Sequence, residues 1–293
     1  MRPNSLALSL TLCLGTAAHG GQAEFVGAFE WERPESYFGG WSGLEIGADG
    51  EEFLAIGDRS QVVEGRLLRE NGVIVGVEAG TIGGLQATNG VEIHSLKSPT
   101  LGDSEGLAAA PGGGFFVSFE DEDRVWRYDG PSSAAEPLPF EPNFRRFSRN
   151  SGLEALALAP DDVLFAIPEV SDGADIPFPV FRYRDGVWDS TLSLPRRGNF
   201  RISGADFDPD GRLYILERIV TPIGFRSRVR RFGFDEGRIV REEVLMASAP
   251  GEHDNLEGIA VWSAPDGLRI TLISDNNFRW FQVTEFVEYR LTD

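Results

Sequence analysis

Residues 103–120 read DSEGLAAAPGGGFFVSFE, and this stretch decides the fold because the chain repeats its pattern four more times. A carboxylate among small residues opens it, a short apolar run and a Pro/Gly-rich turn follow, and a second apolar run ends in another carboxylate. The related stretches are 42–58, 151–169, 203–217 and 256–275. Two short apolar runs joined by a tight turn predict two neighbouring β-strands in each copy.

The spacing of the copies predicts how these strand pairs are arranged. The first acids of successive copies are 60, 49, 52 and 51 residues apart, and they are Glu45, Glu105, Glu154, Asp206 and Glu257. A period of this length, with two to four strands per unit, is typical of a β-propeller. We therefore predict an all-β fold, a single β-propeller with five blades favoured. Six blades stay open as an alternative because the longest interval has room for a degenerate blade.

The two ends of the sequence also contain strand-like segments, at 25–31 and 281–291. We expect them to share the last blade, which closes the ring and leaves no open sheet edge between the ends. No linker or low-complexity segment interrupts the remainder, so residues 24–293 are predicted to form one propeller domain.

The first residues have the pattern of an export signal. Arg2 is followed by the uncharged run 6–18 and then by small residues, which predicts a signal peptide over 1–23, cut after Ala23. The run is too short to span a bilayer, and no later segment is apolar enough to do so. We therefore expect a periplasmic or secreted protein. The single cysteine, Cys13, lies in this leader, so the mature chain is expected to have neither a disulfide nor a thiolate.

The charge balance excludes one large class of partners. The chain has 46 acidic and 27 basic residues, a formal net charge of -19. Affinity for nucleic acid comes from concentrated Lys and Arg, so no nucleic-acid partner is expected. An acidic protein is better suited to binding cations. We expect it to be a monomer.

The repeated acids are predicted to gather at one mouth of the central channel. In a propeller blade the innermost strand begins on the face where the second strand ends, so both acids of each copy should emerge together. The acids at the second position are Asp58, Glu120, Glu169, Glu217 and Asp275. Two charges about 9 Å apart repel by roughly 2 kcal/mol at an effective dielectric of about 20, so bare acids could not all remain ionised there.

Three arrangements would relieve this repulsion: a bound cation, pairing with arginine, or protonation. Oxygen ligands without cysteine favour a hard ion, Ca²⁺ first, with Mg²⁺ and Mn²⁺ as alternatives. The predicted metal ligands are Glu45, Asp58, Glu105, Glu154 and Glu257. A purely structural role stays open, in which each acid accepts backbone N–H groups from a neighbouring blade.

Two arginines and one histidine are candidate partners of these acids. Arg149 and Arg201 each lie five residues before a first-position acid, so both are predicted to bind an anionic substrate group. The alternative is that they only neutralise the acids. His253 lies four residues before Glu257 and is a weaker candidate for a base or ligand. The repeat serines are expected to satisfy turns, because the chain lacks a G-x-S-x-G elbow.

The motifs GWSGLEIGADG (40–50), DSEGLA (103–108), NSGLEALAL (150–158) and DNLEGIAVW (254–262) resemble the phytase-like propeller family, which is described as having esterase-like activity of phytase. The resemblance implies a propeller, export and possible calcium-assisted hydrolysis of a phosphate or other ester. It implies axial acids at Glu45, Glu105, Glu154 and Glu257. The fourth copy departs from the pattern, with Ala205 before Asp206.

These observations predict an exported, metal-dependent hydrolase of phosphoesters or other esters, acting on a small anionic ester at the channel mouth. Two alternatives stay open. One is a non-catalytic propeller that binds calcium or another ligand. The other is a lactonase, because SEGLA (104–108) and LEGIA (256–260) are also similar to strand starts of gluconolactonase-type propellers.

Overall fold

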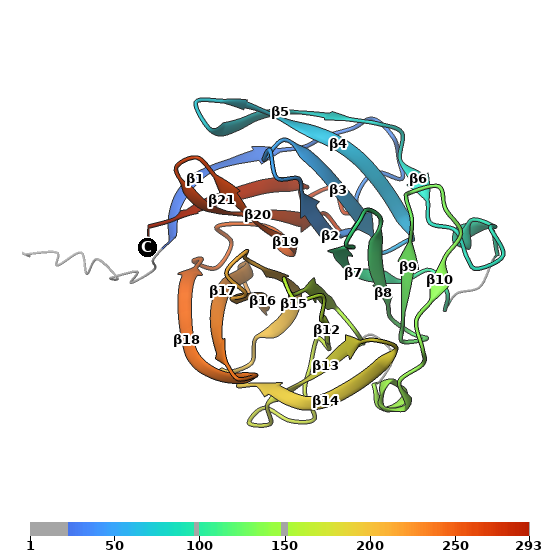
Figure 1. Ribbon diagram of the computed structural model, residues 1–293. Helices are drawn as coiled ribbons and strands as arrows, with labels where there is room; N and C mark the ends of the chain where they lie inside the picture. The colour runs from blue at the N-terminus through green and yellow to red at the C-terminus, as the bar shows by residue number, and fades with distance from the viewer. Residues whose placement is uncertain (1–22, 97–99, 148–151, 293) are drawn as a thin grey trace, which may run out of the picture.

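The computed structural model describes residues 23–96, 100–147 and 152–292, which form five antiparallel sheets arranged as blades around a central axis (Figure 1). The predicted five-bladed β-propeller is confirmed. The described residues contain no α-helix, only the 3₁₀ turns η1 (Ile93–Leu96) and η2 (Pro142–Arg146). Within the described parts of the chain, no helix has the length and apolar character needed to cross a membrane.

Each blade has four main strands, and its innermost strand is the first in the chain in blades 1 to 4 and β19 (Asn255–Ala264) in blade 5. Blade 1 has β2 (Trp41–Ile46), β3 (Glu52–Gly57), β4 (Gln61–Glu70) and β5 (Val73–Ala79), with the short β6 (Gly83–Gly84) also paired to β4. Blade 2 has β7 (Ser104–Ala109), β8 (Phe115–Phe119), β9 (Arg124–Tyr128) and β10 (Glu136–Pro137). Blade 3 has β11 (Ala155–Leu158), β12 (Leu164–Ile167), β13 (Phe178–Arg184) and β14 (Val187–Leu194).

Blade 4 has β15 (Arg201–Phe207), β16 (Leu213–Thr221), β17 (Gly224–Asp235) and β18 (Arg238–Ala247). Blade 5 has β19 (Asn255–Ala264), β20 (Gly267–Asp275), β21 (Glu285–Leu291) and β1 (Ala23–Glu30). The outermost strand of blade 5 is thus the first strand of the chain, paired antiparallel with β21 from Ala23↔Leu291 to Glu30↔Glu285. This confirms the predicted closure of the ring by the two ends.

Glycines let the innermost strands approach one another closely. A Cβ atom at Gly106 would lie 2.6 Å from the backbone nitrogen of Leu156 in blade 3, and one at Gly258 would lie 3.0 Å from that of Leu44 in blade 1. Gly43 and Gly204 have similar contacts, and Ala155 has the corresponding place in blade 3. These five close-approach positions therefore set where each innermost strand lies along the central axis relative to its neighbours.

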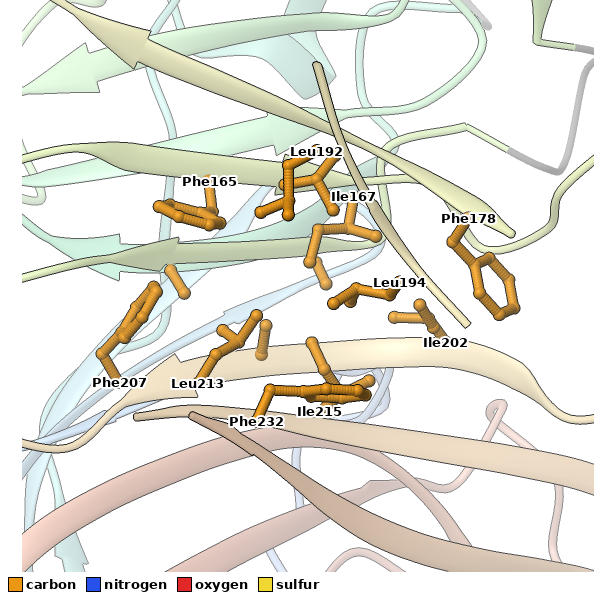
Figure 2. Close-up of a cluster of buried hydrophobic side chains, with 14 of the residues drawn as sticks. Phe165, Ile167, Phe178, Leu192, Leu194, Ile202, Phe207, Leu213, Ile215 and Phe232 are labelled. Carbon is orange, nitrogen blue, oxygen red and sulfur yellow. The ribbon is translucent and has the colours of Figure 1, made fainter. Parts of the chain in front are cut away.

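Apolar layers between neighbouring blades form the core. Between blades 3 and 4, Phe165 and Ile167 of β12 pack with Phe207 of β15 and with Leu213 and Ile215 of β16 (Figure 2). The core therefore lies between the blades.

On one face the first two strands of each blade are joined by tight turns, for example 110–114 in blade 2 and 208–212 in blade 4. The opposite face carries the long connections 31–40, 168–177 and 276–284, together with the described parts of 80–103 and 138–154. We call this second face the mouth face. Innermost strands begin there and second strands end there.

Candidate metal-binding mouth

Backbone pairing defines one equivalent pair of residues per blade at the mouth face. The N–H group of Asp58 donates to the carbonyl of Gly40 at 2.7 Å, that of Glu120 to Asp103 at 2.8 Å, and that of Glu169 to Gly152 at 3.0 Å. The corresponding pairs in blades 4 and 5 are Arg201↔Arg218 and Asn255↔Asp275. Each first member lies three residues before the close-approach position of its blade.

This register gives the second-strand ends of the mouth: Asp58, Glu120, Glu169, Arg218 and Asp275. Four of the five predicted second-position acids are therefore at equivalent places. Glu217 is the exception. Its carboxylate is fully buried within blade 4 and pairs with Arg228 at 2.5 Å and Arg230 at 2.6 Å. Adjacent residues of a strand point to opposite sides, so Arg218 replaces an acid at the mouth.

The residues just before the close-approach positions form a second, inner set: Ser42, Glu105, Glu154, Ser203 and Glu257. All five are at least nine-tenths buried. The inner set therefore contains three carboxylates, from blades 2, 3 and 5, and two serines. Ser203 donates to the carbonyl of Leu256 at 3.2 Å, so it bonds to the innermost strand of blade 5 and not to a turn of its own blade.

The structure does not bring Glu45 and Asp206 to the mouth, contrary to the expectation from sequence. The Glu45 carboxylate accepts the N–H of Ala109 at 2.7 Å, and Ala109 lies four residues beyond Glu105, about 13 Å along the strand. Asp206 likewise accepts the N–H of Val261 at 2.5 Å, four residues beyond Glu257. Both carboxylates therefore lie toward the opposite end of the axis, where they accept hydrogen bonds from neighbouring blades.

The cause is the position of the acid relative to the close-approach glycine. In blades 2 and 5 the acid directly precedes that glycine, whereas in blades 1 and 4 it follows the glycine by two residues. A difference of three residues moves the side chain about 10 Å along a strand. Burial raises the pKa of Glu45 well above its usual value, and the charge of Asp206 adds to the effect.

Acids of blades 1 and 2 form a compact group, which we call the cation half: Asp58, Asp103, Glu105 and Glu120. Carboxylate oxygens of Asp103, Glu105 and Glu120 lie within 4.8 Å of one another. Among the described residues, no ion pair reaches any acid of the cation half. Three oxygen atoms at this separation could hold a hard divalent cation.

Burial raises the pKa of every acid in the cation half. For Glu105 the increase is large, and the charges of Glu154 and Asp103 add to it. Burial raises the pKa of Glu120 to about 7 and that of Asp58 to about 7. The charge of Arg59 opposes this increase at Asp58, but burial outweighs it, and a divalent cation would favour the ionised form of all four acids.

Two buried oxygen atoms at the mouth lack a hydrogen-bond partner, namely Asp58 Oδ1 in the cation half and Asn255 Oδ1 at the start of the innermost strand of blade 5. Buried polar atoms are nearly always hydrogen-bonded or bound to an ion. Asn255 is 2% exposed, and its amide nitrogen donates to Glu257 Oε1 at 2.6 Å. These oxygen atoms fit a site that takes a cation with water ligands.

The acids of blades 3 and 5 have a different partner, and we call this group the arginine half: Glu154, Glu169, Glu257, Arg201 and Arg218. Arg218 Nη2 lies 3.0 Å from Glu257 Oε1 and 3.7 Å from Glu169 Oε1. Arg201 Nη1 lies 2.6 Å from Glu169 Oε2. Burial lowers the pKa of Arg218, but the carboxylates of Glu257 and Glu154 outweigh this and leave it above the usual value.

The remaining predicted residues are not part of this site. Arg149 lies outside the described residues. His253 Nε2 lies 2.9 Å from the hydroxyl of Tyr289, and Nδ1 lies 3.7 Å from Glu285 Oε1, both on β21. Its ring also packs 6.2 Å from that of Phe25 on β1. These contacts place His253 among the outer strands of blade 5, which removes it as a candidate base for the mouth.

A family model described as "Phytase-like: Esterase-like activity of phytase" matches residues 36–278, which include every residue of both halves of the mouth. The chain belongs to this phytase-like family. Among curated proteins, no sequence matches it.

Several solved structures are similar to this phytase-like chain at low sequence identity. The calcium-binding protein regucalcin from Agrobacterium tumefaciens str. C58 has a TM-score of 0.49 and 10% identity, covering 91% of this chain and 95% of that one. A putative gluconolactonase has a TM-score of 0.48 and 12% identity, covering 91% and 92%. Kuenenia stuttgartiensis hydrazine synthase has a TM-score of 0.43 and 14% identity, and the match covers 88% of this chain and only 65% of that one.

The loop between β20 and β21 forms part of the mouth face of this phytase-like chain and carries exposed aromatic groups. The side chain of Trp280 is 95% exposed and that of Phe281 is 62% exposed. The Arg59 guanidinium, directly after Asp58, lies 3.5 Å from the centre of the Phe278 ring. Beside the acids, the mouth face therefore offers apolar surface that an organic ligand could contact.

Proposed function

We propose that this protein hydrolyses esters, phosphoesters first among them, and that the reaction takes place at the mouth with a divalent cation, Ca²⁺ first, in the cation half. The observation that carries this proposal is the group of three carboxylate oxygens of Asp103, Glu105 and Glu120, on the same face as the two arginines that pair with Glu169 and Glu257. The esterase-like activity in the family description supports the reaction class.

Asp103, Glu105 and Glu120 would hold the cation, with Asp58 as a further ligand. A bound divalent cation would polarise the ester and favour ionisation of a water molecule. The chain's own residues would bind and orient the substrate. Arg201 is suited to an anionic group because its side chain is 52% exposed and shares Glu169 with Arg218. A phosphate or carboxylate arriving from solvent can accept a bidentate hydrogen bond from such a guanidinium.

The experiment that tests this function compares two acids of innermost strands, Glu105 at the mouth and Glu45 toward the opposite end of the axis. Purified protein is assayed against phosphomonoesters, phosphodiesters, carboxyl esters and lactones, with Ca²⁺ and with a chelator. We expect turnover of at least one ester class that the chelator abolishes. Glu105→Gln should reduce kcat by a factor of 100 or more, because it removes a charged ligand. The matched control, Glu45→Gln, lies far from the mouth and should leave kcat within a factor of about 3.

The alternatives give different results in the same assays. A non-catalytic binder would show a Tm that rises with Ca²⁺ and no turnover of any ester. A lactonase would open lactones and leave phosphoesters intact. Equal loss of activity in the Glu45 and Glu105 variants, with both folded, would contradict the location at the mouth.

We also propose that the mature protein begins at Glu24 and is exported to the periplasm or secreted. The pattern of residues 1–23 supports this, and β1 begins at Ala23, so removal of the leader would leave the closing strand almost whole. Fractionation of cells that express the full sequence, followed by N-terminal sequencing of the exported product, tests it. Retention of residues 1–23 in a cytoplasmic product would contradict it.

A further inference from the structure

Arg218 breaks the fivefold pattern of the mouth in a way that has a chemical consequence. At the same register position, blades 1, 2, 3 and 5 have the carboxylates of Asp58, Glu120, Glu169 and Asp275. Blade 4 has an arginine instead, and its side chain is 17% exposed. It lies between acids of two neighbouring blades, Glu169 of blade 3 and Glu257 of blade 5.

The charges of the two halves of the mouth are therefore compensated differently. The arginine half has three carboxylates, with Arg218 on two of them and Arg201 at its rim. In the described structure, no arginine pairs with the cation half. The Arg218 guanidinium lies 3.0 Å from Glu257 Oε1, so a second cation bound by Glu257 would lie close to it, and two like charges repel strongly in a buried site.

We propose that Arg218 is a built-in cation that takes the place of a second metal ion, so that the mouth binds one divalent cation, in the cation half, with a fixed guanidinium opposite it. This inference rests on the proposed function only for the position of the metal ion. An anionic ester between the two would be held by two positive charges, as in a two-metal site, although only one of them is a metal ion.

The hydrogen bonding of Arg218 supports a role in contacting the ligand. Its Nε atom is buried and has no acceptor, while Nη2 is used by the two glutamates. A buried donor without an acceptor destabilises the folded protein, and an oxygen atom that enters the mouth would satisfy it. An ester oxygen is such an acceptor, so Arg218 would contact the substrate as well as balance the acids.

The test is the number of Ca²⁺ ions bound per chain, measured by isothermal titration calorimetry and by equilibrium dialysis on the metal-free full-length mature protein. We expect one ion in the wild type and one in Arg218→Lys, which keeps the charge. We expect two ions in Arg218→Gln, because Glu154, Glu169 and Glu257 then lack their buried cation. Arg201→Gln is the matched control, since Arg201 also pairs with Glu169 but at the half-exposed rim, and it should stay at one.

Thermal unfolding gives a second readout that needs no turnover. In chelator, Arg218→Gln should have a lower Tm than the wild type, and Ca²⁺ should raise its Tm by more than it raises that of the wild type. If Arg218→Gln folds only with Ca²⁺, it can be purified with the ion and its metal content counted. The double variant Arg218→Gln/Glu257→Gln removes one charge of each sign and should return to one ion.

The outcomes separate this inference from the proposed function. One ion in the wild type and two in Arg218→Gln support the inference even if no ester is hydrolysed. Two ions in the wild type, or one in Arg218→Gln, overturn it and leave a metal-dependent hydrolase possible. No Ca²⁺ binding by any variant overturns both.

Discussion

Replacing Glu120 by glutamine should stabilise the metal-free protein at alkaline pH, although it removes a proposed metal ligand. Burial raises the pKa of Glu120 to about 7 from an ordinary value of 4.5, a difference of about 2.5 units. At about 1.36 kcal/mol per unit, ionised Glu120 costs the folded state about 3 kcal/mol relative to the unfolded state. Glutamine has no such cost, and its oxygen can still accept the 2.8 Å hydrogen bond from the N–H of Gly152.

The sign of this effect depends on pH. Below about pH 4.5 the carboxyl is protonated in both states, so variant and wild type should unfold alike. Between about pH 4.5 and 7 the folded wild type holds a proton that the unfolded chain has released, so its stability falls relative to the variant as pH rises. At pH 8 the full difference of about 3 kcal/mol should appear, or about 6–12 °C in Tm.

Calcium should reverse the difference, because a bound cation compensates the Glu120 charge in the wild type alone. The assay is thermal and denaturant unfolding of both proteins at pH 4.5 and pH 8, in chelator and in excess Ca²⁺. Glu45→Gln is the control: the pKa of Glu45 is also raised, so this variant should gain stability at pH 8, but by the same amount with and without Ca²⁺. A Glu120→Gln variant that is no more stable than wild type at pH 8 in chelator would refute the reasoning.

Three further predictions concern the scaffold. Glu217→Gln removes the carboxylate that Arg228 and Arg230 share in the core of blade 4, so denaturant unfolding should show a loss of about 3–5 kcal/mol, and a loss below 1 kcal/mol would contradict the buried pairing. Gly106→Ala should cost about 1–3 kcal/mol because the new Cβ would lie 2.6 Å from the Leu156 nitrogen, whereas Gly130→Ala, with no atom within 4 Å, should change stability by less than about 0.5 kcal/mol. Deleting residues 23–30 removes β1 and leaves β21 as an open edge, so gel filtration should show association or aggregation in place of a single compact species, and an unchanged elution volume would argue against closure by β1.

The repeat was enough to predict the fold because each copy contains its own strands and turn. Five copies predict five blades, and the strand-like segments at both ends predict the shared blade 5. The same regularity misled the prediction of the site. Matching the copies by their acids puts Glu45 and Asp206 with Glu105, whereas the structure matches them by the close-approach glycines. The number of residues between acid and glycine can be read from the sequence. Which residue contacts the neighbouring blade, and therefore which residues of the copies are equivalent, is known only from the folded structure.

Arg218 was missed for a related reason. Glu217 satisfies the pattern of a strand that ends in an acid, and this pattern predicts no role for the residue after it. Counting back from the close-approach Gly204 to Arg201, and across the backbone pair to Arg218, would have identified it, but that pairing is a property of the folded blade. A β-bulge between Ile202 and Gly204 shifts the register in this blade and cannot be read from the strand pattern.

The variation among the copies can be understood from the repulsion that a symmetric mouth would create. Five inner carboxylates would have ten mutual pairs, and three have only three, so serines at Ser42 and Ser203 lower this repulsion by roughly two thirds at equal spacing. Arg218 then compensates acids on one side only. If the mouth served the scaffold alone, arginines in blades 1 and 2 could pair with these acids as Arg218 does with Glu169 and Glu257. Among the described residues, no arginine pairs with the acids of the cation half, so this is the side where a mobile cation can do what Arg218 does for Glu169 and Glu257.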